Sequence, residues 1–169
     1  MKLLGFSLIV CASIVFGLRQ NEDKKNHIVN LNSFILMLDL IKAELNSNVC
    51  SIPELIEKIL PKLNDASLSF VNVLKINLSL LGTKSFSAIW KESLCICSGS
   101  LYDKEFEALE TLGQVLGKYD IETQSHHLDE SIKLLRKSEI DAEFEFPQLK
   151  RLNLGVSVSA GLLLAILLV

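Results

Sequence analysis

The sequence contains few of the residues that make tight turns. Its 169 residues include 8 glycines and 3 prolines, and no stretch is of low complexity or internally repeated. A β protein rich in turns uses both residues more often. Their scarcity therefore argues against that class of fold.

Clustered positive charge is also missing. The 17 Lys and Arg residues are outnumbered by 20 Asp and Glu residues, which gives a formal net charge of −3. Affinity for phosphate requires clustered Lys and Arg. The sequence therefore predicts no nucleic-acid partner.

Side chains arranged for catalysis are not evident. His126 and His127, together with Asp129 and Glu130, are metal-capable side chains three residues apart. Only one histidine falls on each such helical face, and no third ligand accompanies it. A solvated helix face is one interpretation, and a membrane-bound metal-dependent hydrolase is the alternative. We predict a protein that is not an enzyme, with no catalytic, cofactor or metal site.

Two long apolar segments are present instead. Residues 3–18 are uncharged, and so are residues 152–169. Runs of 16 to 18 residues are near the lower limit for crossing a hydrocarbon core of roughly 30 Å at 1.5 Å per residue. We predict a transmembrane anchor over residues 1–18, a second over 152–169, and a domain over 19–151 between them.

Basic residues beside these segments predict the side of the membrane on which the domain lies. Five lie on the domain side, namely Arg19, Lys24, Lys25, Lys150 and Arg151. Only Lys2 lies on the other side. Because Lys and Arg are enriched in cytoplasmic loops, we expect the domain in the cytoplasm. Its three cysteines, Cys50, Cys95 and Cys97, cannot all pair, which agrees with a reducing compartment.

Other interpretations of the apolar segments remain open. Lys2 followed by apolar residues fits a cleaved signal peptide, with Cys11 and Ser13 small enough for the cleavage site. The protein would then be a secreted helical protein. The apolar run continues through Phe16, which favours an uncleaved anchor. For residues 152–169, the alternative is a buried core helix.

Apolar residues in the domain recur with helical spacing. One face of the first helix is formed by Ile28, Leu31, Ile35, Leu38, Ile41 and Leu45. Further helices are expected over residues 51–60, 66–81, 86–97, 104–116 and from 121 onward. Residues 74–80 also alternate like a strand, but a lone strand would have no partner. The predicted fold is all-α, a bundle of about six helices flanked by two transmembrane helices.

Local signals predict where these helices begin. Ser51 and Glu54 have the spacing of a capping box. The other expected caps are Asn64 or Asp65, Ser85, Asp103 and Asp120. Pro147 is expected to interrupt the last helix before the second apolar segment.

The most specific stretch covers residues 112–120, with glycines at positions 113 and 117. It predicts a helix end, a glycine turn, an aspartate cap and a new helix, and Gly113 would let another backbone approach closely. A tight helix–helix corner and a partner-binding site both fit this pattern. The candidate partner-binding residues are Gly113, Gly117, Lys118, Tyr119, Asp120 and Gln124.

An acidic run precedes the second apolar segment. Its members are Glu139, Asp141, Glu143 and Glu145, with Phe144 and Phe146 between them. The run predicts a solvated stretch or, alternatively, a docking strip for a partner.

Several segments together resemble the stage III sporulation protein AB family of endospore-forming bacteria. The resembling segments are residues 1–5, 53–55, 90–92, 154–155 and 162–169. The Leu-Gly-x-x-Leu-Gly-x-x-Asp motif of residues 112–120 is the most specific of them. The resemblance covers essentially the whole chain.

This resemblance implies a function. The domain would be similar to the cytoplasmic domains of inner-membrane platform proteins in type II secretion and type IV pilus machines. The protein would sit in the mother-cell membrane facing the forespore, within a channel-like secretion complex. Its implied partners are a cytoplasmic secretion-type ATPase, stage III sporulation protein AA, and the other proteins of the same operon.

Overall fold

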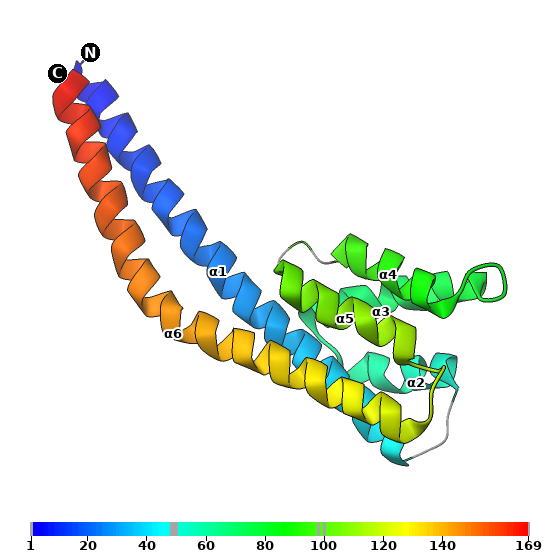
Figure 1. The fold of residues 1–169 in the computed structure, drawn as a ribbon. Helices are drawn as coiled ribbons and strands as arrows, with labels where there is room; N and C mark the ends of the chain where they lie inside the picture. The colour runs from blue at the N-terminus through cyan, green and yellow to red at the C-terminus, as the bar shows by residue number, and fades with distance from the viewer. Residues whose placement is uncertain (1, 48–50, 98, 100, 169) are drawn as a thin grey trace. The chain divides into compact units, whose positions relative to one another are not determined.

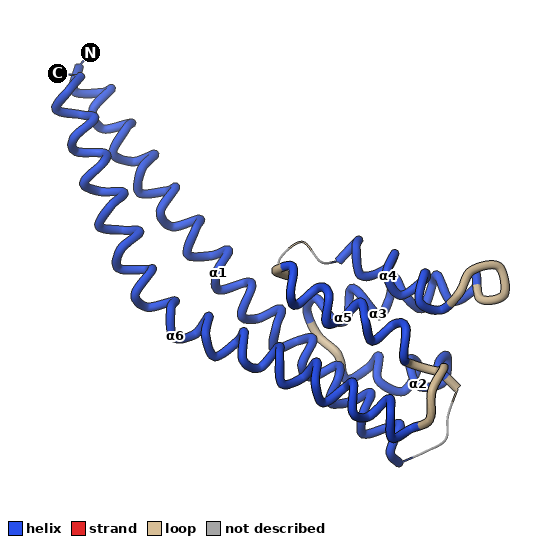
Figure 2. Tube along the Cα trace, viewed as in Figure 1, coloured by secondary structure: helices blue, strands red, loops and turns tan. Residues whose placement is uncertain are grey.

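Helices account for nearly all of the residues that the structure describes (Figures 1 and 2). The computed structural model describes the backbone of residues 2–47, 51–97, 99 and 101–168, and the side chains of 22–47, 51–97, 99, 101–147 and 159. The α-helices are α1 (Lys2–Ser47), α2 (Ile52–Ile59), α3 (Asp65–Asn77), α4 (Phe86–Cys97), α5 (Asp103–Val115) and α6 (Ile121–Leu168). Two 3-10 turns, η1 (Leu60–Lys62) and η2 (Leu78–Leu80), follow α2 and α3. None of the described residues belongs to a named strand, so the all-α prediction is confirmed.

The chain divides into two units. A terminal unit contains Met1–Ile28 and Ile140–Val169, and a central unit contains Val29–Glu139. Helices α1 and α6 each continue through both units. Among the described residues, no helix is both long enough and apolar enough to cross a membrane. The anchors predicted over 1–18 and 152–169 fall, Ser159 apart, on residues whose side chains lie outside the described part of the chain.

The predicted interruption at Pro147 is wrong. Pro147 lies inside α6, which is continuous over 48 residues. A proline in a helix interior loses one backbone hydrogen bond and costs about 3 kcal/mol. The many other turns of so long a helix outweigh this cost, and the proline alone does not end it.

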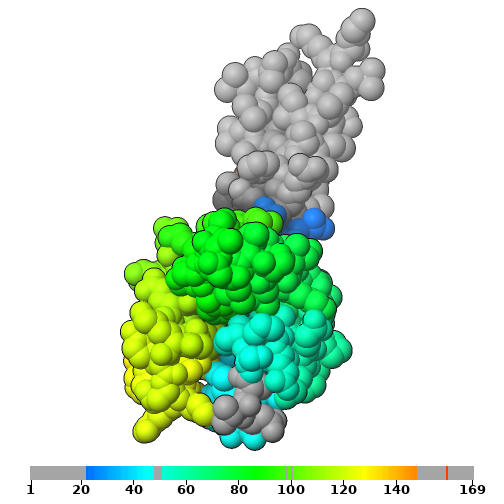
Figure 3. Space-filling model, turned by 90° about the vertical axis from the view of Figure 1, so that its right-hand side faces the viewer, coloured from blue at the N-terminus to red at the C-terminus, as the bar shows by residue number. Residues whose placement is uncertain are grey.

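The core of the central unit is built around one face of α1. Leu31, Leu38 and Ile41 of this face are fully or almost fully buried, as the helical spacing predicts, whereas Ile28 at its start is half-buried. Helices α3, α4 and α5 pack as neighbours, with α4 in the middle. Figure 3 shows α2 and α3, in cyan and teal, on one side of this unit and α6, in yellow, on the other.

Within the central unit, α1 and α6 lie side by side in opposite directions. Arg136 of α6 pairs with Asp39 of α1 at 2.8 Å, and Lys42 of α1 pairs with Asp129 of α6 at 2.5 Å. The Lys42 ammonium group lowers the pKa of the Asp129 carboxyl group through its hydrogen bond. These pairs hold the register of the two helices.

Trp90 of α4 is the largest side chain of the core. Its ring lies edge-on to Phe70 at a centroid distance of 4.9 Å and near Phe86 at 5.7 Å. The indole N–H, which would otherwise be unsatisfied in the core, donates a 2.7 Å hydrogen bond to the carbonyl oxygen of Leu109 on α5. Trp90 therefore connects α3, α4 and α5.

The helix starts agree with the local signals only in part. Ser85 and Asp120 accept hydrogen bonds from backbone N–H groups at the starts of α4 and α6. Ser51 makes no cap hydrogen bond, so the predicted capping box does not form. Asp103 is the first residue of α5 rather than its cap, because Tyr102 precedes it as N-cap and donates its N–H to Glu105 Oε2 at 2.8 Å.

Candidate functional site

The corner between α5 and α6 begins with a left-handed residue. Gly117 has φ +74°, a conformation that side chains other than glycine rarely adopt. A β-carbon at this position would also come 3.0 Å from Cγ1 of Ile52. The chain leaves α5 here and turns toward α6, as the glycine predicts.

Two polar side chains at the start of α6, Gln124 in its first turn and Asp120 just before it, hold the turn in place. Gln124 is only 6% exposed; its Oε1 accepts the N–H of Gly117 at 3.1 Å, and its Nε2 donates to the carbonyl oxygen of Tyr119 at 2.5 Å. Asp120 accepts the backbone N–H of Thr123 at 2.9 Å and its hydroxyl group at 2.7 Å. These hydrogen bonds lower the pKa of the Asp120 carboxyl group. Hydrogen bonds at the start of α6 therefore fix the conformation of the corner.

Gly113 fixes the corner to the core. A β-carbon on Gly113 would come 2.4 Å from Cδ1 of Trp90. The expected close approach at Gly113 is therefore made by an aromatic ring of α4.

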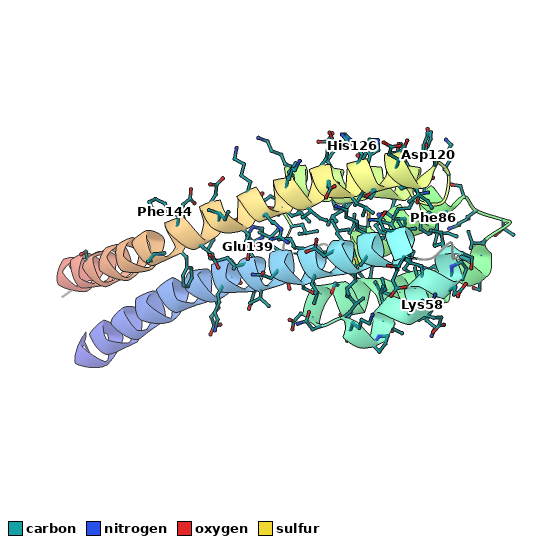
Figure 4. All side chains as sticks on the ribbon, turned by 90° about the horizontal axis from the view of Figure 1, so that it is seen from below. Lys58, Phe86, Asp120, His126, Glu139 and Phe144 are labelled. Atoms are coloured by element: carbon teal, nitrogen blue, oxygen red, sulfur yellow. The ribbon has the colours of Figure 1, made fainter. Side chains whose placement is uncertain are left out.

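The six predicted partner-binding residues thus fall into two groups. Gly113 and Gln124 are buried and Gly117 carries no side chain, so these three shape the corner. Lys118, Tyr119 and Asp120 are exposed, with the Lys118 ammonium group 5.5 Å from the centroid of the Tyr119 ring. Figure 4 shows Asp120 where α6 begins, with its side chain outside the ribbon. That these residues bind a partner stays a prediction.

A groove of about 550 Å³ opens beside the corner. One wall is the start of α4 and the other is the end of α5, and the lining residues include Phe86, Lys91, Glu110, Leu116 and Lys118. Lys91 and Glu110 pair across it at 2.6 Å, and the carboxylate raises the pKa of the Lys91 ammonium group. The sequence did not predict that the start of α4 forms one wall of this groove. The only available signals were the Ser85 cap and the 90–92 segment of the family resemblance.

The histidine pair offers no metal site within the described part of the chain. Nδ1 of His126 lies 3.7 Å and Nδ1 of His127 lies 3.5 Å from the same oxygen of Glu130. Asp129 is engaged by Lys42. No group of three or more His, Cys, Asp or Glu side chains among the described residues could hold a metal ion. The hydrolase alternative therefore gains no support here.

The comparison with protein families identifies the chain. The family model described as stage III sporulation protein AB matches residues 2–169. The chain belongs to the stage III sporulation protein AB family. Membership supports a role in stage III of sporulation.

One solved structure of a stage III sporulation protein AB is also similar. It superimposes with a TM-score of 0.62 at 22% sequence identity, over 71% of this chain and 95% of that chain. At this identity the similarity shows the fold alone. A search of the curated proteins finds no match.

Proposed function

We propose that this family member is a non-enzymatic platform of the complex between mother cell and forespore, and that the α5–α6 corner docks the secretion-type ATPase, stage III sporulation protein AA. The observation that carries the proposal is the exposed triplet Lys118, Tyr119 and Asp120 on a rigid corner. Rigid presentation lowers the entropic cost of binding. Tyrosine is also among the residues that most often dominate interface energies.

The proposed location follows from the two terminal segments. Two anchors, over residues 1–18 and 152–169, would hold the domain over 19–151 on the cytoplasmic face of the mother-cell membrane. The five basic residues beside the anchors support this orientation. Only a cytoplasmic domain is accessible to a cytoplasmic ATPase. The other proteins of the operon would contact the anchors or the remaining surface.

A substitution at Tyr119 tests the docking. Tyr119 and Tyr102 are both 50% exposed, so Tyr102→Ala is a matched control for Tyr119→Ala. Binding of the full-length chain, purified in detergent, to the ATPase would be measured by biolayer interferometry. We expect Tyr119→Ala to weaken binding roughly tenfold or more and Tyr102→Ala to leave it unchanged.

Two results would contradict the docking proposal. The first is that the unsubstituted chain does not bind the ATPase. The second is that Tyr119→Ala binds as tightly as Tyr102→Ala, with unchanged circular dichroism for both variants.

A further inference from the structure

Three exposed apolar side chains lie where α3 ends, within the central unit. We define the apolar tip as Ile76, Leu80 and Leu81, which are 71%, 39% and 42% exposed. Ile76 belongs to the last turn of α3, Leu80 ends η2, and Leu81 follows it directly. Single exposed apolar residues are common on protein surfaces. Three of them within six residues form a patch, which indicates a surface that another molecule covers.

The surface around the apolar tip carries almost no free charge. Residues 66–83 contain one charged residue, Lys75, and it pairs with Glu57 of α2 at 2.8 Å. Lys84, which follows this stretch, pairs with Glu92 of α4 at 2.7 Å. The central parts of protein interfaces are likewise depleted of charged residues. The tip therefore has the composition of an interface.

Hydrogen bonds fix the conformation of the loop that carries the apolar tip (Figure 1). The carbonyl oxygen of Leu80 accepts the backbone N–H groups of Thr83 and Lys84 at 3.1 and 3.0 Å. It also accepts the hydroxyl group of Thr83 at 2.8 Å. A surface that is already ordered loses less conformational entropy when it binds.

We propose that the apolar tip forms a two-fold contact with the apolar tip of a second copy of this chain, with Ile76 of each copy facing Ile76 of the other. A two-fold interface joins the same patch on both copies. A face with free charges would place like charges together in such a contact. The apolar tip avoids this repulsion, because the lysines beside it are paired within their own copy.

A shared membrane favours this contact, a step that rests on the anchors of the proposed function. Identical copies anchored in one membrane carry the apolar tip at the same height. A two-fold axis along the membrane normal can therefore bring tip onto tip. A contact centred on three side chains belongs among the small, weak interfaces. Confinement of both copies to one membrane raises their effective concentration and so favours a weak contact.

A lipid surface fits the apolar tip less well. Segments that lie on membranes combine apolar residues with Lys and Arg that attract anionic headgroups. Lys75 and Lys84 are the basic residues beside the tip, and each is neutralised by a glutamate. A second copy matches the tip in both apolar character and charge.

Photo-crosslinking of the full-length chain tests the contact. The chain would carry p-benzoylphenylalanine in place of Ser79, an exposed residue of η2, in vesicles of phosphatidylcholine and phosphatidylglycerol. We expect illumination to join two copies into an adduct of twice the mass of the chain. The same probe in place of Glu107, an exposed residue of α5, should give no such adduct.

Opposite charges at Ile76 test the two-fold geometry. Ile76→Glu and Ile76→Lys should each lower the adduct yield roughly fivefold or more, because each places like charges across the axis. Two differently tagged chains, one Ile76→Glu and one Ile76→Lys, should form a mixed adduct within about twofold of the unsubstituted yield. Ile96 of α4 is 69% exposed, so Ile96→Glu is the matched control and should leave the yield unchanged.

Three results would overturn the proposal. The first is that the chain floats with the vesicles but forms no adduct from position 79. The second is that the probe joins lipid, or joins the ATPase once it is added, in place of a second copy. The third is that the Glu and Lys variants of Ile76 form no more adduct together than either forms alone, with unchanged circular dichroism.

Vesicle flotation distinguishes this inference from the proposed function. A chain that does not float contradicts the proposed anchors, and with them the shared height of the two tips. A chain that floats without an adduct overturns the self-contact and leaves the proposed location intact. Docking of the ATPase is measured separately through Tyr119→Ala, which leaves the apolar tip unchanged.

Discussion

Gly113 of α5 lies against the face of Trp90 so closely that a β-carbon on Gly113 would come within 2.8 Å of three side-chain atoms of Trp90. The indole ring is itself fixed by its hydrogen bond to Leu109. It cannot move aside without losing this bond. The contact therefore requires glycine at position 113 in the middle of the core.

The first prediction follows from this contact. Gly113→Ala should lower the free energy of unfolding by about 1–2 kcal/mol. Contacts this short put the overpacking cost toward the upper end of about 1–3 kcal/mol, and the helix-propensity gain offsets only about 1 kcal/mol of it. Urea denaturation of the full-length chain measures this. Gly99→Ala is the control, since no atom lies within 4 Å of its β-carbon, and it should change stability by less than about 0.5 kcal/mol. Equal stability of both variants would contradict the requirement for glycine at position 113.

The second prediction concerns Gln124. Gln124→Ala removes two hydrogen bonds of the corner, the one that Gln124 Oε1 accepts from the N–H of Gly117 and the one that Gln124 Nε2 donates to the carbonyl oxygen of Tyr119. We expect the free energy of unfolding to fall by about 1–2 kcal/mol. Gln114→Ala, at an exposed position of α5, is the control and should have little effect. If both variants unfold at the same urea concentration, the hydrogen bonds of Gln124 do not contribute to stability.

The third prediction is a pH dependence at Asp120. The pKa of its carboxyl group is lowered in the folded chain by the backbone N–H and hydroxyl group of Thr123. The stabilisation is therefore complete above the ordinary aspartate pKa of about 3.9 and is lost as the pH falls through the lower, folded-state value. The melting temperature of the unsubstituted chain should exceed that of Asp120→Ala at pH 7, and the difference should shrink toward pH 2.

Asp120→Asn is the matched control for this dependence. Asparagine keeps a side-chain oxygen for the cap but does not titrate. Its melting temperature relative to Asp120→Ala should stay constant over the same pH interval. A difference between the unsubstituted chain and Asp120→Ala that is constant with pH would show that the cap does not depend on the charge.

The fourth prediction is the topology. In sealed membranes of known sidedness, protease should cleave the 100–140 region only from the cytoplasmic side, because five basic residues lie on the domain side of the two proposed anchors and Lys and Arg are enriched in cytoplasmic loops. An antibody to that region would follow the fragments. Protection on the cytoplasmic side would place the domain between the two membranes, out of reach of a cytoplasmic ATPase.

Much of the helical order could be predicted from the sequence. The spacing of apolar residues from Leu31 to Leu45 is the buried face of α1, and the ambiguous segment after Asn64 is α3 followed by a 3-10 turn. These predictions succeed because periodic burial dominates a helix. Gly117 and Asp120 also succeed, since a left-handed turn and an N-cap depend on local chemistry.

Two kinds of feature could not be predicted in the same way. A spacing does not guarantee a cap, since Ser51 and Glu54 have the spacing of a capping box without forming it, whereas Glu105 closes the start of α5 through the backbone of Tyr102. The groove depends on contacts between residues that are distant in the sequence. Lys91 and Glu110 are 19 residues apart and meet only because α4 packs against α5.

The position of Trp90 also makes it an intrinsic fluorescence probe. Trp90 is the only tryptophan of the sequence. It packs against Gly113, and Gly113 is also one of the residues that line the groove. Any occupant that presses on the groove therefore acts one residue away from the sole indole. Fluorescence of the unlabelled chain is therefore expected to report both loosening of the core and filling of the groove.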